Sequence, residues 1–366
     1  MSASDIRWPR LRVLGDGGAI GGVFEADVVS NNHFAADRFR LGVAVSADPA
    51  GAAGLMDRAG QVLDVQIALD DGAGFTSLVK GEVDQVRLDA TRGVLRVEGR
   101  DLSARLMETR TAELFANMTA ADIVRDLAAR HGLAADVAPG GALVGRGWMP
   151  GRTRLGRERL GLGHYSRLPT EWDVLVGLAG FEGFDVWVEG ETLHFRPAPP
   201  ARAVLLTPSS VSGLRLERAL TLAGDIEVVV RSWSVAQHQA FAQTARRAGA
   251  TGGVGATGGR AKGGVGRRQR YVYVVPGLAP DEALKLAQAR LAEITRHERV
   301  VSIDMPGDLA IAPRGRVRLA GTGTDFDQDY RVDRVERRVS VAHGFRQSVQ
   351  ARNASTGQEV SAWSSF

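Results

Sequence analysis

The sequence contains no cysteine, which excludes disulfide bonds, catalysis by a thiolate and zinc sites with cysteine ligands. This absence fits a cytoplasmic origin. The chain also has no run of about eighteen apolar residues, so we expect neither a transmembrane helix nor stable membrane insertion. The first residues, MSASDIRWPRLRVL, lack the apolar core of a secretory signal, and secretion by that route is not expected.

Motifs for nucleophilic or metal-dependent catalysis are missing as well. The sequence has no G-x-S-x-G motif, and its seven histidines lack the spacing of metal ligands. These histidines are His33, His131, His164, His194, His238, His297 and His343. We therefore predict no catalytic residue, no cofactor and no metal, in a protein that is not an enzyme. A hydrolase with carboxylates far apart in the sequence, for example a cell-wall enzyme, stays open as an alternative.

One acidic segment has the spacing of a calcium-binding loop. Asp325, Asp327 and Asp329 occupy alternate positions, and Glu336 stands at the twelfth place. The sixth place is Tyr330, where the tight turn of such a loop needs glycine. The segment is therefore predicted to be a solvated acidic turn between two strands.

Positive charge is concentrated in a glycine-rich segment over residues 246–270, which contains no acid. Removing its seven cations from the 46 basic residues leaves 39 against 42 acidic residues elsewhere, although the whole chain has a net charge of +4. The segment has too few apolar groups to offset the entropy of ordering it, which predicts a long mobile loop. Its candidate polyanion-contacting residues are Arg246, Arg247, Arg260, Lys262, Arg267, Arg268 and Arg270.

Two interpretations of this basic loop remain open. The charge can attract DNA, an acidic partner or anionic lipid without sequence specificity. Alternatively, the loop is a flexible hairpin tip that only adds solubility, and this is the interpretation we favour. No aromatic residue interleaves the charges, so base stacking has no support.

The first hundred residues have the pattern of short β-strands. Apolar residues alternate with polar ones over 38–45 and again over 62–69, the period of a half-buried strand. Further strands are expected over 11–14, 23–29, 75–80, 83–88 and 94–97. Six or more short strands separated by turn residues indicate a small barrel or sandwich.

Three amphipathic helices are expected in the remainder of the chain. Thr119 and Thr170 stand at N-cap positions, each with an aspartate three residues later, which is the pattern of a capping box. Gly132 and Gly183 are suited to ending these helices in a left-handed conformation. The third helix is expected from Pro280 to Glu298.

The segments around these helices are expected to be strands. A hairpin is predicted about Gly190, and the alternation over 226–230 predicts a strand that pairs with 271–275. The last expected strands are 300–305, 316–320, 330–341 and 345–352. The polar tail, residues 354–366, is predicted to be disordered in isolation.

Three strings, in this order and spacing, resemble the late control protein D family of phage tail hubs, which is related to the hub part of type VI secretion VgrG proteins. They are EGRDLSARLMETRTAELFANMTAADIVRDLAARHGL at 98–133, LPTEWDVLVGLAGFEGFDVWVEGETLHFRP at 168–197 and MPGDLAIAPRGRVRLAGTGTDFDQDYRVDRVERRVS at 305–340. The resemblance covers roughly residues 10–353.

The resemblance implies a mainly β fold with an α/β insert, in which two tube-protein-like β-barrels accompany a small α/β domain. The implied domains are a first barrel at 1–104, the α/β domain at 105–197 and a second barrel at 198–353 that carries the loop 246–270. The tail follows at 354–366.

In function, the resemblance implies a structural tail or baseplate hub. Three copies would form a homotrimer with a pseudo-sixfold ring that adapts the hexameric tail tube to the trimeric spike and forms part of the central channel. The implied partners are the tail tube protein or distal tail ring, a separate central spike protein and the tape-measure protein, with DNA only as transient cargo. The implied location is the virion tail, assembled in the bacterial host cytoplasm.

Alternatives to this phage hub are the hub of a related contractile injection system and a β-rich protein that binds nucleic acid or carbohydrate. The basic loop is the one feature that favours the second of these.

Overall fold

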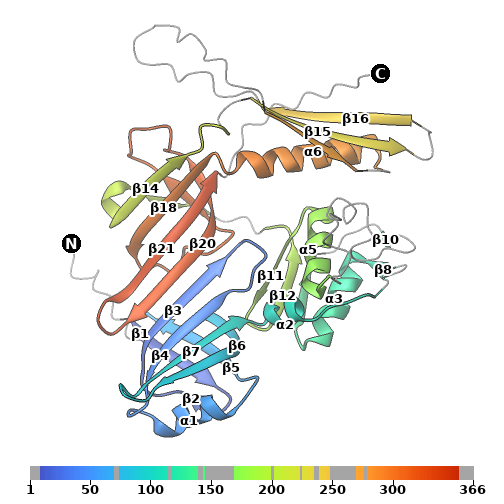
Figure 1. Cartoon of the computed structure of the whole chain (residues 1–366). Helices are drawn as coiled ribbons and strands as arrows, with labels where there is room; N and C mark the ends of the chain where they lie inside the picture. Colours follow the sequence, from blue (N-terminus) through green and yellow to red (C-terminus); the bar gives the residue numbers. More distant parts are fainter. Residues whose placement is uncertain are drawn as a thin grey trace.

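The computed structural model describes residues 9–69, 74–113, 115, 118–138, 143–144, 169–198, 202–222, 225–234, 239–247, 269–275 and 278–353. Strands form most of the regular structure, and thirteen of them join in one sheet (Figure 1). The described part of the predicted basic loop is its two ends, and residues 248–268 and the tail 354–366 lie outside the described residues.

The N-terminal strands form the first half-sheet, in the order β3-β4-β7-β6-β5-β1. Its elements are β1 (Arg10–Gly15), β2 (Gly18–Ala19), β3 (Val23–Asn31), β4 (Arg38–Ala44), α1 (Pro49–Asp57), β5 (Val62–Ala68), β6 (Thr76–Asp89) and β7 (Val94–Asp101). Val28 on β3 and Val13 on β1, at opposite ends of this order, lie in one hydrophobic core. The half-sheet is therefore rolled around its core, as in a small barrel.

The C-terminal strands form the second half-sheet, in the order β14-β18-β21-β20-β19-β13. Its elements are β13 (Val204–Leu206), the 3₁₀ helix η3 (Pro208–Ser210), β14 (Gly213–Arg218), β18 (Arg299–Pro306), β19 (Arg316–Leu319), β20 (Asp329–Ser340) and β21 (Gly344–Asn353). Leu206 on β13 and Leu216 on β14 again share one core, which contains the fully buried Tyr330.

The two half-sheets have the same strand order, and their strands occur in the same order along the chain. Each has a long central hairpin, β6–β7 or β20–β21, which turns at a glycine with positive φ, Gly93 or Gly344. The final pairing differs, because β1 runs antiparallel to β5 whereas β13 runs parallel to β19. The chain therefore contains one topological unit twice.

The half-sheets are joined through β20, which has different neighbours along one of its edges. Arg316 and Arg318 of β19 pair with Arg331 and Asp329 at the start of β20. Further along the same edge, residues 334–340 pair antiparallel with residues 25–31 of β3. This β20–β3 junction joins the two half-sheets into one continuous sheet (Figure 1).

A small α/β unit lies between the half-sheets in sequence. Its elements are α2 (Ser103–Glu108), β8 (Met118–Thr119), α3 (Ala120–Arg130), β9 (Ala134–Val137), β10 (Leu143–Val144), α5 (Glu171–Glu182), β11 (Asp185–Glu189) and β12 (Thr192–Arg196). Both predicted capping boxes are present, at Thr119 and at Thr170. Gly183 ends α5 in the predicted left-handed conformation, with a φ of 72°.

A second α/β unit lies inside the region predicted as the second barrel. The strands β15 (Ile226–Ser234), β16 (Gln239–Arg247) and β17 (Gln269–Val274) form a separate three-stranded sheet, which α6 (Pro280–Thr295) covers on one face. Its core joins Val228 and Val230 to Ala287 and Leu291. Alternation in the sequence predicts β15 and its partner β17, but alternation does not indicate which sheet a strand enters.

Several local features differ from the prediction, and the elements α2, β9, β13 and β14 were not expected. Helix α1 was not expected, because its Gly- and Ala-rich segment has little amphipathic pattern; Asp48 caps it and Leu55 is buried. Strand β16 was not expected either. The segments 75–80 and 83–88 are one strand, β6, with a register shift between Val83 and Gln85.

Candidate assembly surface

The two half-sheets present a face of charged side chains on the side away from their cores. In β3 and β4, Val28 and Leu41 point into the core, so that Asp27 and Arg40 point to the other face. These charges form ion pairs across the strands: Arg40 Nε lies 3.1 Å from Glu98 Oε1 on the neighbouring strand, and Arg96 Nη1 on β7 reaches past Gly42 of β4 to lie 2.8 Å from Glu25 Oε2 on β3. The face therefore carries both signs of charge in paired rows.

One of these ion pairs crosses the β20–β3 junction. Arg338 Nε donates to Asp27 Oδ1 over 2.6 Å, although the two residues are 311 positions apart in the sequence. Next to this pair, on the core side, Arg337 and Val28 are opposed and buried. The junction thus has opposite charges on its open face and closely packed side chains beneath.

Contacts between the α/β unit of α3 and α5 and the two half-sheets involve a few long side chains. Trp172 Nε1 donates to the carbonyl oxygen of Phe34 over 2.6 Å. Arg314, in the second half-sheet, stacks over the ring of Trp187 with 4.7 Å between the guanidinium carbon and the ring centroid. Arg331 of β20 forms an ion pair with Asp185 of β11.

Two buried carboxyl groups lie close together below these contacts. The backbone N–H of Asp37 donates to Asp101 Oδ2 over 2.9 Å, and the N–H of Asn31 donates to Asp37 Oδ1 over 2.9 Å. Burial, together with the charge of Asp101, raises the pKa of Asp37 from 3.8 to about 7. Burial also raises the pKa of Asp101, while hydrogen bonds from Ser103 oppose this shift. The pair is internal and joins the ends of β4 and β7.

Of the seven candidate polyanion-contacting residues, three lie within the described part of the chain. Arg246 and Arg247 are the last residues of β16, and Arg270 is the second residue of β17, so the predicted loop is shorter at both ends. Arg260, Lys262, Arg267 and Arg268 lie outside the described residues.

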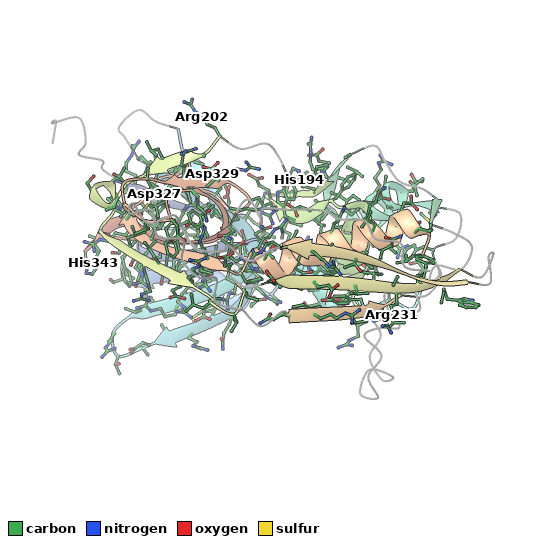
Figure 2. All side chains as sticks on the ribbon, turned by 90° about the horizontal axis from the view of Figure 1, so that it is seen from above. His194, Arg202, Arg231, Asp327, Asp329 and His343 are labelled. Carbon is green, nitrogen blue, oxygen red and sulfur yellow. The ribbon has the colours of Figure 1, made fainter. Side chains whose placement is uncertain are left out.

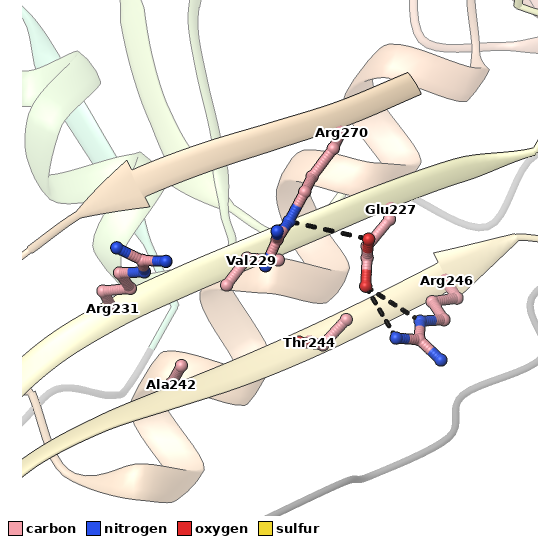
Figure 3. Close-up of a pocket in the computed structure, with 7 residues that line it drawn as sticks. All are labelled: Glu227, Val229, Arg231, Ala242, Thr244, Arg246 and Arg270. Carbon is pink, nitrogen blue, oxygen red and sulfur yellow. Dashed lines mark hydrogen bonds and ion pairs between the residues drawn. The ribbon is translucent and has the colours of Figure 1, made fainter. Parts of the chain in front are cut away.

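The three described arginines all have acidic partners, which come from outside the predicted loop. Arg246 Nη2 lies 2.7 Å and Arg270 Nε 3.6 Å from oxygens of Glu227, as Figure 3 shows. Arg247 Nη1 lies 3.0 Å from Glu298 Oε2. Ion pairing of this kind reduces the positive charge these residues offer to a polyanion.

Glu227 and its two arginines line a shallow hollow on the face of the three-stranded sheet opposite α6. Arg231 lines the same hollow, on the strand that carries Glu227 (Figure 3). Figure 2 shows Arg231 far from Asp327 and Asp329, the residues of the acidic turn. The hollow and the acidic turn are thus separate features of the surface.

The acidic turn between β19 and β20 is held by its own hydrogen bonds and by arginines. The hydroxyl of Thr322 and the backbone N–H groups of residues 321–323 donate to Asp327, and they hold its pKa below the usual range. Asp325 pairs with Arg218 and Arg299 at 3.0 and 2.7 Å. Among the described residues, no group of three or more His, Asp or Glu side chains could hold a metal ion.

No helix in the described ranges is long and apolar enough to cross a membrane. No family model and no curated protein matches the chain. Solved structures, in contrast, match nearly the whole chain. The tail protein from Neisseria meningitidis MC58 has a TM-score of 0.68 and 16% identity, over 95% of this chain and 98% of that chain.

Two further structures have the same arrangement. The 43 kDa tail protein of prophage MuSo2 from Shewanella oneidensis has a TM-score of 0.66 and 13% identity, over 96% of this chain and 98% of that chain. A type VI secretion system component from E. coli, itself similar to T4 phage tail proteins, has a TM-score of 0.54 and 12% identity, over 96% and 79% of the two chains. The fold predicted from the family resemblance, mainly β and hub-like, is therefore confirmed.

Proposed function

We propose that this chain is the structural hub of a phage tail or of a related contractile injection system. Three copies form a closed ring that adapts a hexameric tail tube to a trimeric spike and encloses part of the central channel. The role is non-enzymatic. The protein is located in the tail of the particle, and the tail is assembled in the cytoplasm of the bacterial host.

The observation that carries this proposal is the duplicated strand order. A hexameric tube ring needs six equivalent docking surfaces, whereas a trimeric spike needs three. A trimer of a chain with two topologically equal half-sheets offers six similar units. The β20–β3 junction already places two such units side by side in one ladder, so a ring needs only the same junction between copies.

The proposed partners are those that the resemblance to tail hubs implies. One side of the ring contacts the tail tube protein or a distal tail ring, and the other contacts a separate spike protein. The tape-measure protein and then DNA pass through the channel, the DNA only as transient cargo. We propose that the open face lines the channel, where its paired charges of both signs would leave little net field to hold a polyanion.

The mass of the full-length protein in solution tests the proposal. Mass photometry and sedimentation velocity are expected to show a species of three times the 39.0 kDa chain, with no larger series. A chain that stays monomeric at all concentrations and does not join tail particles would contradict the hub. A peptidoglycan-release assay is expected to show no turnover, and turnover would instead support the hydrolase.

Replacing residues 248–268 by a short Gly-Ser linker tests the alternative of nucleic-acid binding. This replacement leaves Arg246, Arg247 and Arg270, with their ion pairs, in place. The hub predicts that the variant still forms trimers and that DNA binding by the intact chain is weak and lost at moderate salt. Tight DNA binding that disappears in the variant would favour the alternative.

A further inference from the structure

Several strand edges have no partner strand among the described residues, and two of them belong to β6 and β14. Strand β6 pairs with β7 along one edge, and with β5 along the other only as far as Glu82. Beyond the register shift at Val83, residues 84–89 leave that second edge open. Strand β14 pairs with β18 on one edge, and its other edge is open. Such edges expose backbone N–H and C=O groups that another strand can satisfy.

The repeat shows that these two open edges correspond to the two strands of the β20–β3 junction. In the shared strand order, β6 takes the place of β20, and β14 takes the place of β3. Strand β20 pairs with β19 up to Arg331 and then, beyond its own register shift, with β3. Strand β6 pairs with β5 in the same way, but beyond Glu82 no described strand pairs with this edge of β6.

The ladders fix which residues correspond. The shift between Val83 and Gln85 in β6 matches that between Val332 and Arg334 in β20. Glu82 then corresponds to Arg331, and their partners are Val62 of β5 and Arg316 of β19. The same counting continues from β7 to β4 in the first half-sheet and from β21 to β18 in the second, and there Leu41 corresponds to Ile303. Leu41 pairs with Ala26 of β3, and Ile303 pairs with Leu214 of β14, so Ala26 corresponds to Leu214.

We propose that β6 of one copy pairs antiparallel with β14 of a neighbouring copy, in the register of the β20–β3 junction. In the junction, Glu336, Arg337 and Arg338 oppose Val29, Val28 and Asp27. The corresponding pairs between copies join Arg87 to the neighbour's Glu217, Leu88 to the neighbour's Leu216, and Asp89 to the neighbour's Arg215. This pairing rests on the proposed trimer and specifies its interface.

The side chains at these positions are complementary. Two opposite-charge pairs form on the open face, and Asp89 with Arg215 repeats the ion pair of Arg338 and Asp27 with the charges exchanged. The side chains of Arg215 and Glu217 are exposed and form no hydrogen bond or ion pair with another described residue. On the core side, Leu88 is 44% exposed, and the neighbour's Leu216 would cover it.

A shift of this register by one residue would destroy the match. Because side chains alternate between the two faces, a one-residue slip would place Arg87 and Asp89 opposite Leu216 and Leu214. A two-residue slip would place Arg87 opposite Arg215, a pair of like charges. The charges therefore select one register out of the possible pairings of these two edges.

A charge exchange with rescue tests the pairing in the full chain. Arg87→Glu places two glutamates opposite each other, and Glu217→Arg places two arginines opposite each other. Each pair occurs three times in a ring, so each single variant is expected to weaken trimer formation roughly tenfold to a hundredfold. The double variant Arg87→Glu, Glu217→Arg restores the opposite charges and is expected to recover most of the affinity. Double variants no better than the singles would overturn the register.

Covalent trapping provides the second test, and the absence of native cysteine makes it specific. The variant Arg87→Cys, Glu217→Cys is expected to form disulfide-linked dimers and trimers, since directly opposed strand residues lie within disulfide reach. Arg40→Cys, Glu217→Cys is the control, because Arg40 lies on the same face but on β4, which pairs on both edges. It is expected to stay uncrosslinked.

The outcomes separate this inference from the proposed function. Trimers in solution without crosslinks at 87 and 217 would overturn the pairing and leave the hub intact. Crosslinked products that continue beyond three chains would support the pairing and contradict a closed trimer. A monomer without crosslinks would contradict both.

Discussion

At the scale of single residues, the feature with the clearest consequence is the buried carboxyl pair of Asp37 and Asp101. Burial and mutual repulsion disfavour the ionised forms, which is why the pKa of Asp37 is raised to about 7. The folded state therefore retains a proton on Asp37 that the unfolded chain releases near its ordinary value of 3.8. Because the native state binds more protons between these values, stability falls as the pH rises from about 4 to about 7.

Asp37→Asn is expected to remove this loss of stability. Asparagine is neutral in both states, and its carbonyl oxygen can still accept the hydrogen bond from the N–H of Asn31. At pH 8 the variant should gain roughly 1–3 kcal/mol in its free energy of unfolding, and the gain should shrink towards pH 4. Urea unfolding at pH 4.5, 6 and 8 measures this. The exposed Asp57→Asn is the control for loss of one negative charge, and an equal pH dependence in both variants would contradict the expectation.

Some residue roles could be read from the sequence and others could not. Gly99 stands in the string EGRDLSA that carries the family resemblance, and the structure supplies its reason. A Cβ atom there would lie 2.3 Å from both the carbonyl oxygen of Glu82 and the ring of Phe39. The pairing of Asp27 with Arg338 has no such local signal, because no short-range pattern connects residues so far apart in sequence.

At the scale of elements, the three longer helices, α3, α5 and α6, were predicted best because their signals are local, whereas α1 and α2 were missed. Thr170 and Asp173 form the expected capping box: the hydroxyl of Thr170 accepts from the N–H of Asp173 over 3.1 Å, and Asp173 Oδ2 accepts from the N–H of Thr170 over 2.9 Å. These bonds satisfy donors that the first turn of α5 would otherwise leave unpaired. The helix in turn places Trp172 and Leu175 in the core of its unit.

Thr170→Ala is expected to lower the free energy of unfolding by about 1 kcal/mol, because the first turn loses its side-chain cap. The loss should be local: hydrogen exchange should accelerate in the first turn of α5 and leave β20 and β21 unchanged. Thr76→Ala, at an exposed strand position without a cap, is the matched control. A destabilisation shared equally by both variants would show that the cap contributes nothing.

Strands were predicted as individual segments, but their assignment to sheets was not. Alternation over 226–230 gives the strand β15 but not its place in a separate three-stranded sheet with α6. Strand β16 escaped detection because its alternating residues are small or polar, as in Ala242 and Thr244. The candidate site shows the same limit: composition identifies Arg246 and Arg270, yet their shared partner Glu227 lies about twenty or more residues earlier, outside the basic segment.

At the scale of the whole molecule, the repeat explains why one chain can have two edges that fit each other. The β20–β3 junction stabilises contact between two half-sheets within a copy, and the proposed β6–β14 contact uses the corresponding strands between copies. Sequence comparison of the half-sheets does not show this relation, because corresponding residues such as Arg337 and Leu88 differ in kind. Only the ladder registers place them together.

If the ring forms only from folded chains, its assembly must also stabilise the fold. Binding that is restricted to the native state raises the unfolding temperature with concentration. A hundredfold dilution of the intact chain is expected to lower the apparent Tm by roughly 2 °C, a small shift because the unfolding entropy of a chain of this size is large. Differential scanning fluorimetry over a concentration series measures it. Arg87→Glu should lose the trimer at concentrations roughly tenfold to a hundredfold higher, and its Tm at high dilution should equal that of the intact chain, since the exposed ion pair of Arg87 with Glu98 within one copy contributes little. A lower Tm for this variant at high dilution would instead show that Arg87 stabilises the single chain, and the loss of trimers would then not report on the contact between copies.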